Sequence, residues 1–272
     1  MSRIPDSFNN GSDKPMNKLN ILLLILAMFI SKTVLAVEGS FDDWPTEEEL
    51  KDESPWKGDV QFGYLMTSGN TETSNMSGEF NINYGTVNWR HLLSLRGFSS
   101  SDDDNTTAEH YKIDFQSDKK IDEDSYYFGN FLYEEDHFSG FDYRTSATFG
   151  YGHRLFNREK TSLGTEIGIG YRKSEVTPSD VILDGDSSED EAIIRLAALY
   201  HWEIAKDRSL DADLTVDGGE ELTITNFELS FVTLVVGNLS FNATYAARYT
   251  SRVPVDKENL DSVVSLKLLY AF

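Results

Sequence analysis

The feature that most constrains the fold is a pattern repeated about twelve times, in which a segment of about ten residues alternates apolar and polar side chains and ends in turn-forming residues. Residues 239–250 show it most clearly, with Leu, Phe, Ala and Tyr at alternate positions. Neighbouring side chains of a strand point to opposite faces, so the alternation predicts strands with one apolar face each. The segment at residues 221–236 changes phase near Asn226, which predicts a β-bulge. The chain is therefore expected to be all-β.

Three architectures fit this alternation: a transmembrane β-barrel, a soluble sandwich and a soluble lipocalin-like barrel. The alternation alone does not tell which face points inward. An even number of strands, aromatic residues near the strand ends, and charges of both signs on the polar faces favour a membrane barrel with a wet lumen. We predict an antiparallel transmembrane β-barrel of about 12 strands over residues 56–272, in the bacterial outer membrane.

The lengths of the connections support the same architecture. If the N-terminus lies in the periplasm, the outward connections include the longest one, residues 173–190. The periplasmic connections are mostly short, such as residues 85–88 and 237–238. Outer-membrane barrels have this asymmetry, with short periplasmic turns and longer extracellular loops.

The N-terminal region predicts export. Lysines precede an apolar run at residues 21–30, and small residues lead up to Ala36. This pattern predicts a signal peptide over residues 1–36, with Met16 as an alternative start. The apolar run is too short for a transmembrane helix. Residues 37–55 are acidic and contain two prolines, and there we expect a short, solvated periplasmic arm rather than a helix.

The last eleven residues alternate up to the final phenylalanine. This segment resembles the C-terminal strand by which bacterial outer-membrane barrels are recognised for assembly. The residues expected to carry that signal are Leu266, Leu268, Tyr270 and Phe272. The predicted partners are therefore the barrel-assembly machinery, outer-membrane lipid and lipopolysaccharide, and the barrel is expected to be a monomer.

The polar faces of the strands predict a network of charges in the lumen. Its expected members are Arg90, Arg96, Asp114, Arg144, Glu166, Arg172 and Arg195. Arg144 and Arg172, together with Arg154, are expected to pair with the two acids of this set. Such a network is structural by default, and in a conducting barrel the same charges tune ion passage.

Composition restricts the other ligands. The net charge of −22 argues against nucleic acid, whose phosphates require Lys and Arg. The chain contains no cysteine, so the fold holds without disulfides. Oxygen-rich loops offer weak Mg²⁺ or Ca²⁺ candidates, namely Asp102, Asp104, Asp184, Asp186 and Asp190. A solvated acidic loop is the simpler interpretation, and no metal or cofactor is assigned.

The five histidines are the natural places to look for catalysis. They are His91, His110, His137, His153 and His201. None shows the spacing of a Ser/His/Asp or metal-ligand motif. His137, next to Asp136, is the best candidate for an alternative function as an outer-membrane hydrolase of lipase or protease type. The prediction is that the protein is not an enzyme and has no catalytic residues.

Several ordered motifs resemble one family. They include Trp56-x-Gly58, residues 67–71 (TSGNT), residues 133–144, Gly150-Tyr151-Gly152-x-Arg154-Leu155, residues 163–172, and Val253-Pro254 before the final strand. Together they are similar to the YdiY-like, salt-induced outer-membrane protein family. The resemblance implies an outer-membrane barrel whose biochemical role is poorly defined. The expected function is a narrow pore or an envelope component linked to salt or osmotic stress. An outer-membrane hydrolase and a soluble periplasmic lipocalin-like binder remain the alternatives.

Overall fold

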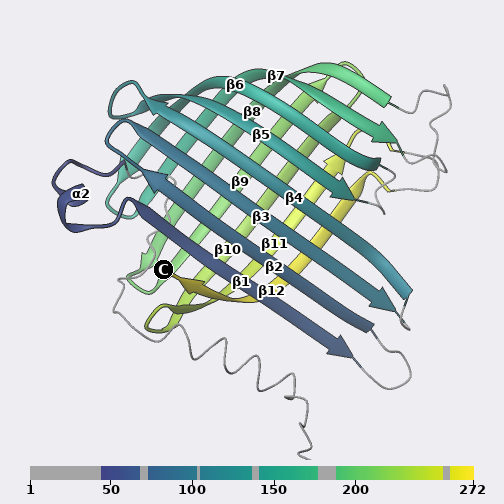
Figure 1. Cartoon of the computed structure of the whole chain (residues 1–272), viewed down its shortest axis with the longest axis horizontal. Coiled ribbons are helices and arrows are strands. Elements are labelled where there is room, and N and C mark those ends of the chain that lie inside the picture. Colours follow the sequence, from purple (N-terminus) through teal and green to yellow (C-terminus); the bar gives the residue numbers. More distant parts are fainter. Residues whose placement is uncertain (1–43, 68–72, 103–104, 137–140, 177–187, 254–257) are drawn as a thin grey trace, which may run out of the picture. The chain divides into compact units, whose positions relative to one another are not determined.

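The computed structural model describes residues 44–67, 73–102, 105–136, 141–176, 188–253 and 258–272. Twelve antiparallel strands follow one another around a closed barrel, and β1 pairs with β12 (Figure 1). The predicted fold class is confirmed. The predicted signal peptide lies outside the described residues, as does the first part of the arm.

The strands are long enough to cross a membrane when tilted. Their bounds are β1 (Trp56–Thr67), β2 (Thr73–Gly85), β3 (Trp89–Asp102), β4 (Asn105–Lys120), β5 (Ser125–Asp136), β6 (Phe141–Arg158), β7 (Thr161–Val176), β8 (Ser188–Ala205), β9 (Arg208–Gly219), β10 (Thr223–Val236), β11 (Leu239–Thr250) and β12 (Leu260–Ala271). Among the described residues, no helix is long and apolar enough to cross a membrane.

The two ends of the barrel differ. At one end the strands are joined by short turns such as residues 159–160, 206–207 and 237–238, where Gly237 has a positive φ of 56°. At the other end the connections include residues 177–187 and 251–259. Short turns mark the periplasmic side of outer-membrane barrels, so we call the first end periplasmic and the second extracellular.

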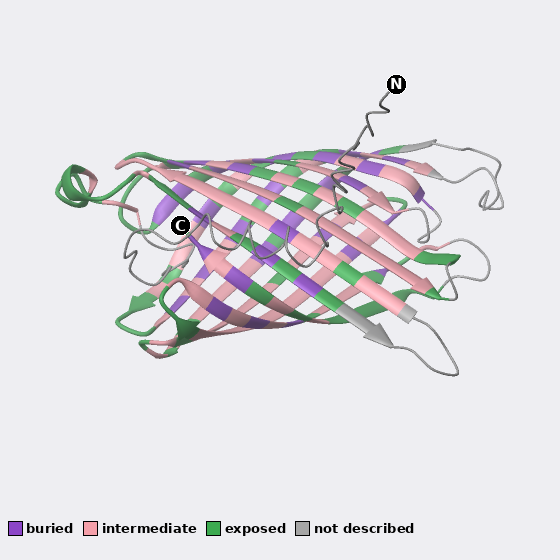
Figure 2. Ribbon diagram, turned by 60° about the horizontal axis from the view of Figure 1, so that its bottom comes forward, coloured by how far each residue is buried: buried purple, intermediate pink, exposed green. Residues whose placement is uncertain are grey.

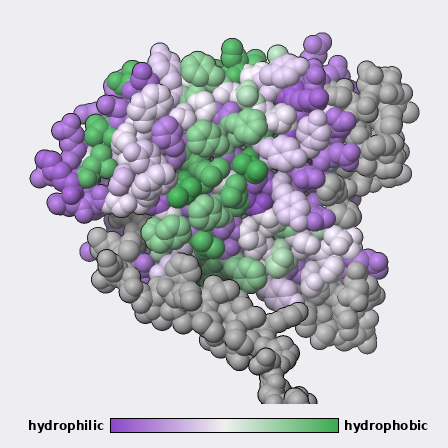
Figure 3. All heavy atoms as spheres, in the orientation of Figure 1, coloured by the Kyte–Doolittle hydropathy of each residue, from purple (hydrophilic) through white to green (hydrophobic). Residues whose placement is uncertain are grey.

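The outer face of the barrel is apolar. Along the strands, buried and exposed side chains alternate (Figure 2), and the exposed positions include Phe149, Ile169 (69% exposed) and Val264 (73% exposed). Hydrophobic side chains gather over the middle of the strands, with hydrophilic ones toward both ends (Figure 3). This apolar belt is the lipid-facing surface of a transmembrane barrel. A lipocalin-like binder has its apolar side chains inside, so that alternative does not hold.

Aromatic rings form a girdle at the periplasmic end of the belt. Trp56 packs on Tyr84 with ring centroids 4.6 Å apart, and Tyr84 stacks on His91 at 6.0 Å. His91 also stacks on Trp89 at 5.9 Å. Aromatic side chains favour the membrane–water interface because one end is apolar and the other polar.

The predicted bulge near Asn226 is wrong. β10 pairs with β9 in one continuous register, and its register shift against β11 lies between Leu234 and Val236. The apolar phase changes in the sequence because Leu222 and Ile224 point into the barrel, where both are buried against Phe141. The backbone keeps its alternation while the lumen becomes locally apolar.

The arm before β1 contains a short helix, α2 (Glu49–Asp52), where a solvated arm without a helix was expected. The Glu49 carboxylate accepts hydrogen bonds from the Thr46 N–H and hydroxyl, both at 2.8 Å. These bonds, the backbone one foremost, lower the pKa of Glu49. The Glu49 N–H in turn donates to the Thr46 hydroxyl at 3.2 Å. This reciprocal Thr-x-x-Glu arrangement is that of a capping box, which stabilises the turn leading into the helix. The helix itself is mostly exposed.

Candidate functional site in the barrel lumen

Ion pairs fill the barrel lumen in three groups along its length. All seven residues predicted for the lumen network have buried or half-buried side chains, and each contacts a polar partner. We describe the groups from the extracellular end to the periplasmic end.

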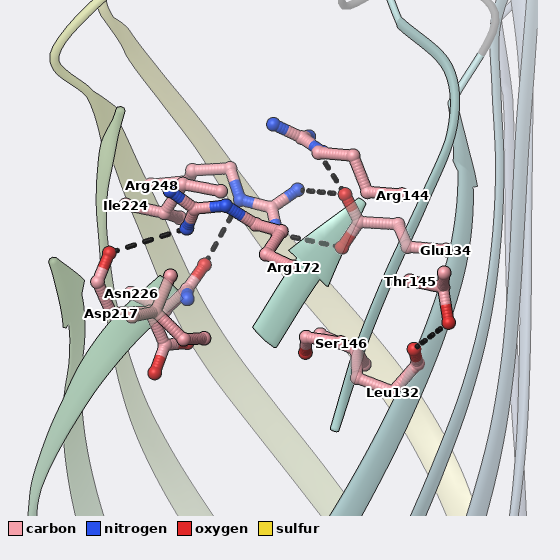
Figure 4. A pocket seen from close by; sticks show the side chains of 11 residues that line it. Leu132, Glu134, Arg144, Thr145, Ser146, Arg172, Asp217, Ile224, Asn226 and Arg248 are labelled. Atoms are coloured by element: carbon pink, nitrogen blue, oxygen red, sulfur yellow. Dashed lines mark hydrogen bonds and ion pairs between the residues drawn. The ribbon is translucent and has the colours of Figure 1, made fainter. Parts of the chain in front are cut away.

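The extracellular group centres on Glu134 of β5, which is 1% exposed. Arg248 of β11 donates two parallel hydrogen bonds to its carboxylate, both at 2.6 Å, and Arg144 of β6 donates a third at 2.7 Å (Figure 4). β5 and β11 are six strands apart in a ring of twelve. The Glu134–Arg248 pair therefore joins opposite walls across the lumen, in the bidentate geometry that gives the strongest charge-assisted bonds.

Arg172 of β7 extends this group toward β8 and β9. It donates to the Glu191 carboxylate at 2.5 Å, to the Asp217 carbonyl at 3.2 Å, and to the Leu222 carbonyl. Arg195 lies 3.4 Å from the Asp217 carboxylate. The carboxylate of Glu191 also accepts the backbone N–H groups of the β9–β10 connection, so this connection is fixed over the lumen.

A small cavity remains between these side chains. It is lined by Glu134, Arg144, Arg172, Asp217, Asn226 and Arg248 among others, and its volume is about 20 Å³ (Figure 4). A cavity of this size holds about one water molecule. Because the Glu134–Arg248 pair joins opposite walls at this level, the extracellular group forms a constriction of the lumen.

The middle group also crosses the lumen. Arg96 of β3 lies 3.1 Å from Glu79 of β2 and 2.6 Å from Glu228 of β10. Lys267 of β12 donates to Glu79 at 2.7 Å. Opposite charges thus alternate over four strands, and each carboxylate has a cation beside it, as buried charges require.

The periplasmic group lies toward the other end of the lumen. Arg90 donates to the buried Asp118 at 2.7 Å and 3.0 Å. The Arg90 guanidinium lies over two rings, 5.0 Å from the centroid of Trp44 and 5.5 Å from that of Tyr126. Tyr126 in turn donates to Glu166 at 2.9 Å. Trp44 belongs to the arm before β1, so the arm packs against the lumen residues at this mouth.

The expected pairing of Arg144 and Arg172 with Glu166 or Asp114 is wrong. Arg144 binds Glu134 and Arg172 binds Glu191, whereas Glu166 accepts hydrogen bonds from Gln116 and Tyr126. Asp114 lies beside Lys112 and Asn130. The partners missed by sequence reasoning are Glu79, Asp118, Glu134, Glu191, Asp217, Glu228, Arg248 and Lys267. Most of them occupy polar positions of the alternating segments. Their place in this alternation was the signal that could have identified them as lumen residues.

The described histidines have structural partners. His91, His153 and His201 contact Ser117 at 2.9 Å, Ser125 at 3.2 Å and Asp211 at 2.6 Å, respectively. His110 lies 3.7 Å from Glu134. His137, the candidate for the hydrolase alternative, lies outside the described residues.

Of the five metal candidates, two lie within the described residues. Asp104, Asp184 and Asp186 lie outside the described residues, while Asp102 and Asp190 are exposed near the extracellular strand ends. Within the described ranges, no group of acidic or histidine side chains is placed to hold a metal ion.

A closed antiparallel barrel with an apolar belt outside, an aromatic girdle and a charged lumen defines an integral β-barrel protein of the bacterial outer membrane. The chain belongs to the family described as "Protein of unknown function, DUF481", whose model matches residues 60–272. It is similar to the uncharacterized protein YdiY of Escherichia coli (strain K12), with 26% identity over 92% of this chain and 96% of that protein.

Two solved structures are similar to this chain. The NanC porin is 16% identical with a TM-score of 0.45, and the match covers 79% of this chain and 98% of the porin. An outer membrane channel from Pseudomonas putida F1 is 10% identical with a TM-score of 0.48, covering 86% and 98%.

Proposed function

We propose that the protein is a narrow outer-membrane pore for small ions that the lumen ion pairs hold closed. The observation that carries this proposal is the forked Glu134–Arg248 pair, which spans opposite walls where the remaining cavity is about 20 Å³. A lumen lined by ion pairs opens more easily than one filled with apolar side chains, because water and mobile ions replace the partners of a charged group. Lumen charges of this kind control passage in other barrels.

The electrostatics of the constriction support opening when Glu134 is neutralised. Glu134 holds Arg144 and Arg248 on either side of one carboxylate. Without that charge, the two guanidiniums repel each other and lose their shared acceptor. Breaking one partner of a buried ion pair costs about 3–5 kcal/mol, which is enough to shift a closed state toward an open one.

Planar-bilayer recording of the purified barrel tests this proposal. We expect the Glu134→Gln variant to conduct several-fold more than the wild-type protein at the same salt concentration. The matched control is Glu49→Gln, which removes the same charge from the exposed helix α2 and should leave conductance unchanged. Heat-modifiable gel migration checks that each variant is folded. Silence of both the wild-type protein and folded Glu134→Gln at all salt concentrations would contradict the pore.

The link to salt follows from the same constriction. Mobile ions screen charge pairs, less so when the pairs are buried. We therefore propose that wild-type conductance rises more steeply with salt than bulk conductivity does, and that Glu134→Gln loses this excess. A strictly proportional wild-type response would remove the salt link without removing the pore.

We further propose that the protein is a non-enzymatic monomer that contacts lipid and lipopolysaccharide through its apolar belt. The partners of the described histidines support a structural role for those side chains. Hydrolysis of lipid or peptide substrates by the wild-type barrel, lost in His137→Ala, would favour the hydrolase instead.

A further inference from the structure

We propose that the cavity in the extracellular constriction binds one small inorganic anion of halide size, held by Arg144 and Arg172. This site is independent of conduction, because a closed barrel offers it equally well. Three observations carry the proposal: the unpartnered hydrogen-bond donors of the arginines that line the cavity, the local charge, and the volume.

Two of the arginines that line this cavity each have a buried donor without a partner. The Nη1 of Arg144 and the Nε of Arg172 make no hydrogen bond to the protein, although their side chains are only 5% and 3% exposed. Both residues line the cavity. Arg248, which also lines it, donates from all three of its nitrogens, to Glu134 and Asn226. An unsatisfied buried donor costs about 1–3 kcal/mol, and more when it is charged, so a bound acceptor at this point is favourable.

The charge around the cavity is positive on balance. Of the residues that line it, three carry a guanidinium, Arg144, Arg172 and Arg248, and two carry a carboxylate, Glu134 and Asp217. Glu191, which binds Arg172, lies outside the lining. The two further carboxylates that act on Arg144 and Arg248 are Asp136 and Asp261. They lie near the strand ends and are half-buried and exposed, respectively, so water screens them more than the buried groups.

The surroundings of Arg144 keep solvent away from one side of the site. Its guanidinium lies over the ring of Phe141, 4.6 Å from the centroid, and Phe141 packs with Leu222 and Ile224. A positive group that is desolvated on one face attracts an anion more strongly than it would in water, because the local dielectric is low.

The volume of about 20 Å³ selects the ligand. It corresponds to about one water molecule, so a monatomic anion such as chloride or bromide suits it better than sulfate or an organic anion. The competing occupant is a single water molecule. An anion differs from water in that it also compensates the positive charge of the arginines.

Thermal unfolding of the purified barrel in detergent gives the first test. At matched ionic strength, we expect the Tm to rise saturably with sodium chloride or bromide, by on the order of 3 °C at ten times the dissociation constant. Sodium gluconate and sulfate should not reproduce this rise. Folded Arg144→Gln should lose it. The control Arg96→Gln removes a lumen arginine outside the cavity and should keep it.

Crystals of the wild-type protein grown with bromide give the second test, which needs no variant. An anomalous peak between Arg144 and Arg172 would establish the site even if Arg144→Gln fails to fold. A cavity that holds only water, or equal Tm responses to chloride and gluconate, would overturn the proposal. Either result leaves the conductance test of Glu134→Gln to be judged separately.

Discussion

Gly150 shows at the scale of one residue how the wall makes room for the lumen filling. A Cβ atom at this position would lie 2.2 Å from the Ile167 carbonyl oxygen and 2.7 Å from the ring of Phe128, which is buried. Its register partner, Gly168, is similarly close to the Phe128 ring. The glycines at these inward positions therefore leave the space that an aromatic ring of the neighbouring strand occupies.

Gly150→Ala is expected to destabilise the barrel, because the new methyl group meets backbone that cannot move away cheaply. The expected loss in free energy of unfolding is about 1–3 kcal/mol, measured by denaturant unfolding in lipid or detergent. Gly129→Ala on β5 is the matched control, since nothing lies within 4 Å of its added Cβ. That variant should change stability by less than about 0.5 kcal/mol. Equal losses in the two variants would contradict the steric explanation.

At the scale of elements, the arm before β1 acts on the periplasmic mouth. Trp44 packs edge-on against Tyr126 at 6.2 Å and covers the Arg90 guanidinium. The acidic helix α2 that follows stays exposed. The arm thus contributes one aromatic side chain to the periplasmic mouth, while most of its other described residues are exposed.

Trp44→Ala is expected to open this mouth to reagents. The chain contains no cysteine, so a single Ser94→Cys change, at a half-buried position of β3 whose hydroxyl oxygen is buried, reports lumen access. We expect Trp44→Ala to speed the reaction of that cysteine with a polar thiol reagent added from the periplasmic side by several-fold. Glu47→Gln in the exposed part of the arm serves as the control. Unchanged labelling rates would show that Trp44 does not limit access.

The elements were largely predictable from sequence, and their contacts across the lumen were not. Alternation placed the strands because side-chain direction has a period of two. The pairing of Glu134 with Arg248 depends on how far the strands are staggered when the barrel closes, and a strand's own sequence does not record that stagger. The phase of β10 was mispredicted for a different reason, because Leu222 and Ile224 are apolar residues at inward positions, where they pack on Phe141.

At the scale of the whole molecule, the seam between β1 and β12 is shorter than the hairpin pairings. Four residue pairs join these strands, from Asp59 with Ala271 to Phe62 with Leu268, whereas β1 and β2 share twelve. Gly58 and Phe272 add two reciprocal backbone hydrogen bonds of 3.0 Å and 2.8 Å. Phe272 also stacks on Phe80 with centroids 6.4 Å apart, so it strengthens a junction that has few other contacts.

Removing Phe272 is expected to lower the amount of folded barrel in the outer membrane, because both reciprocal hydrogen bonds and the ring contact are lost at the shortest junction. Immunoblotting of fractionated membranes, with unheated and heated samples, measures this. Phe272→Tyr keeps the backbone and the ring and should assemble normally. Normal levels of the truncated chain would show that neither the seam nor the predicted assembly signal depends on this residue.

The short seam also affects the order in which the strands pair during folding. Eleven of the twelve pairings join neighbours in sequence and form as local hairpins, while the seam joins Asp59 and Ala271 at opposite ends of the described strands. Contacts so distant in sequence form slowly. Before they form, the chain is a curved ribbon with two bare edges, which invite pairing with other chains. Closing the ring thus also removes the two edges through which the unfinished barrel can pair with other chains.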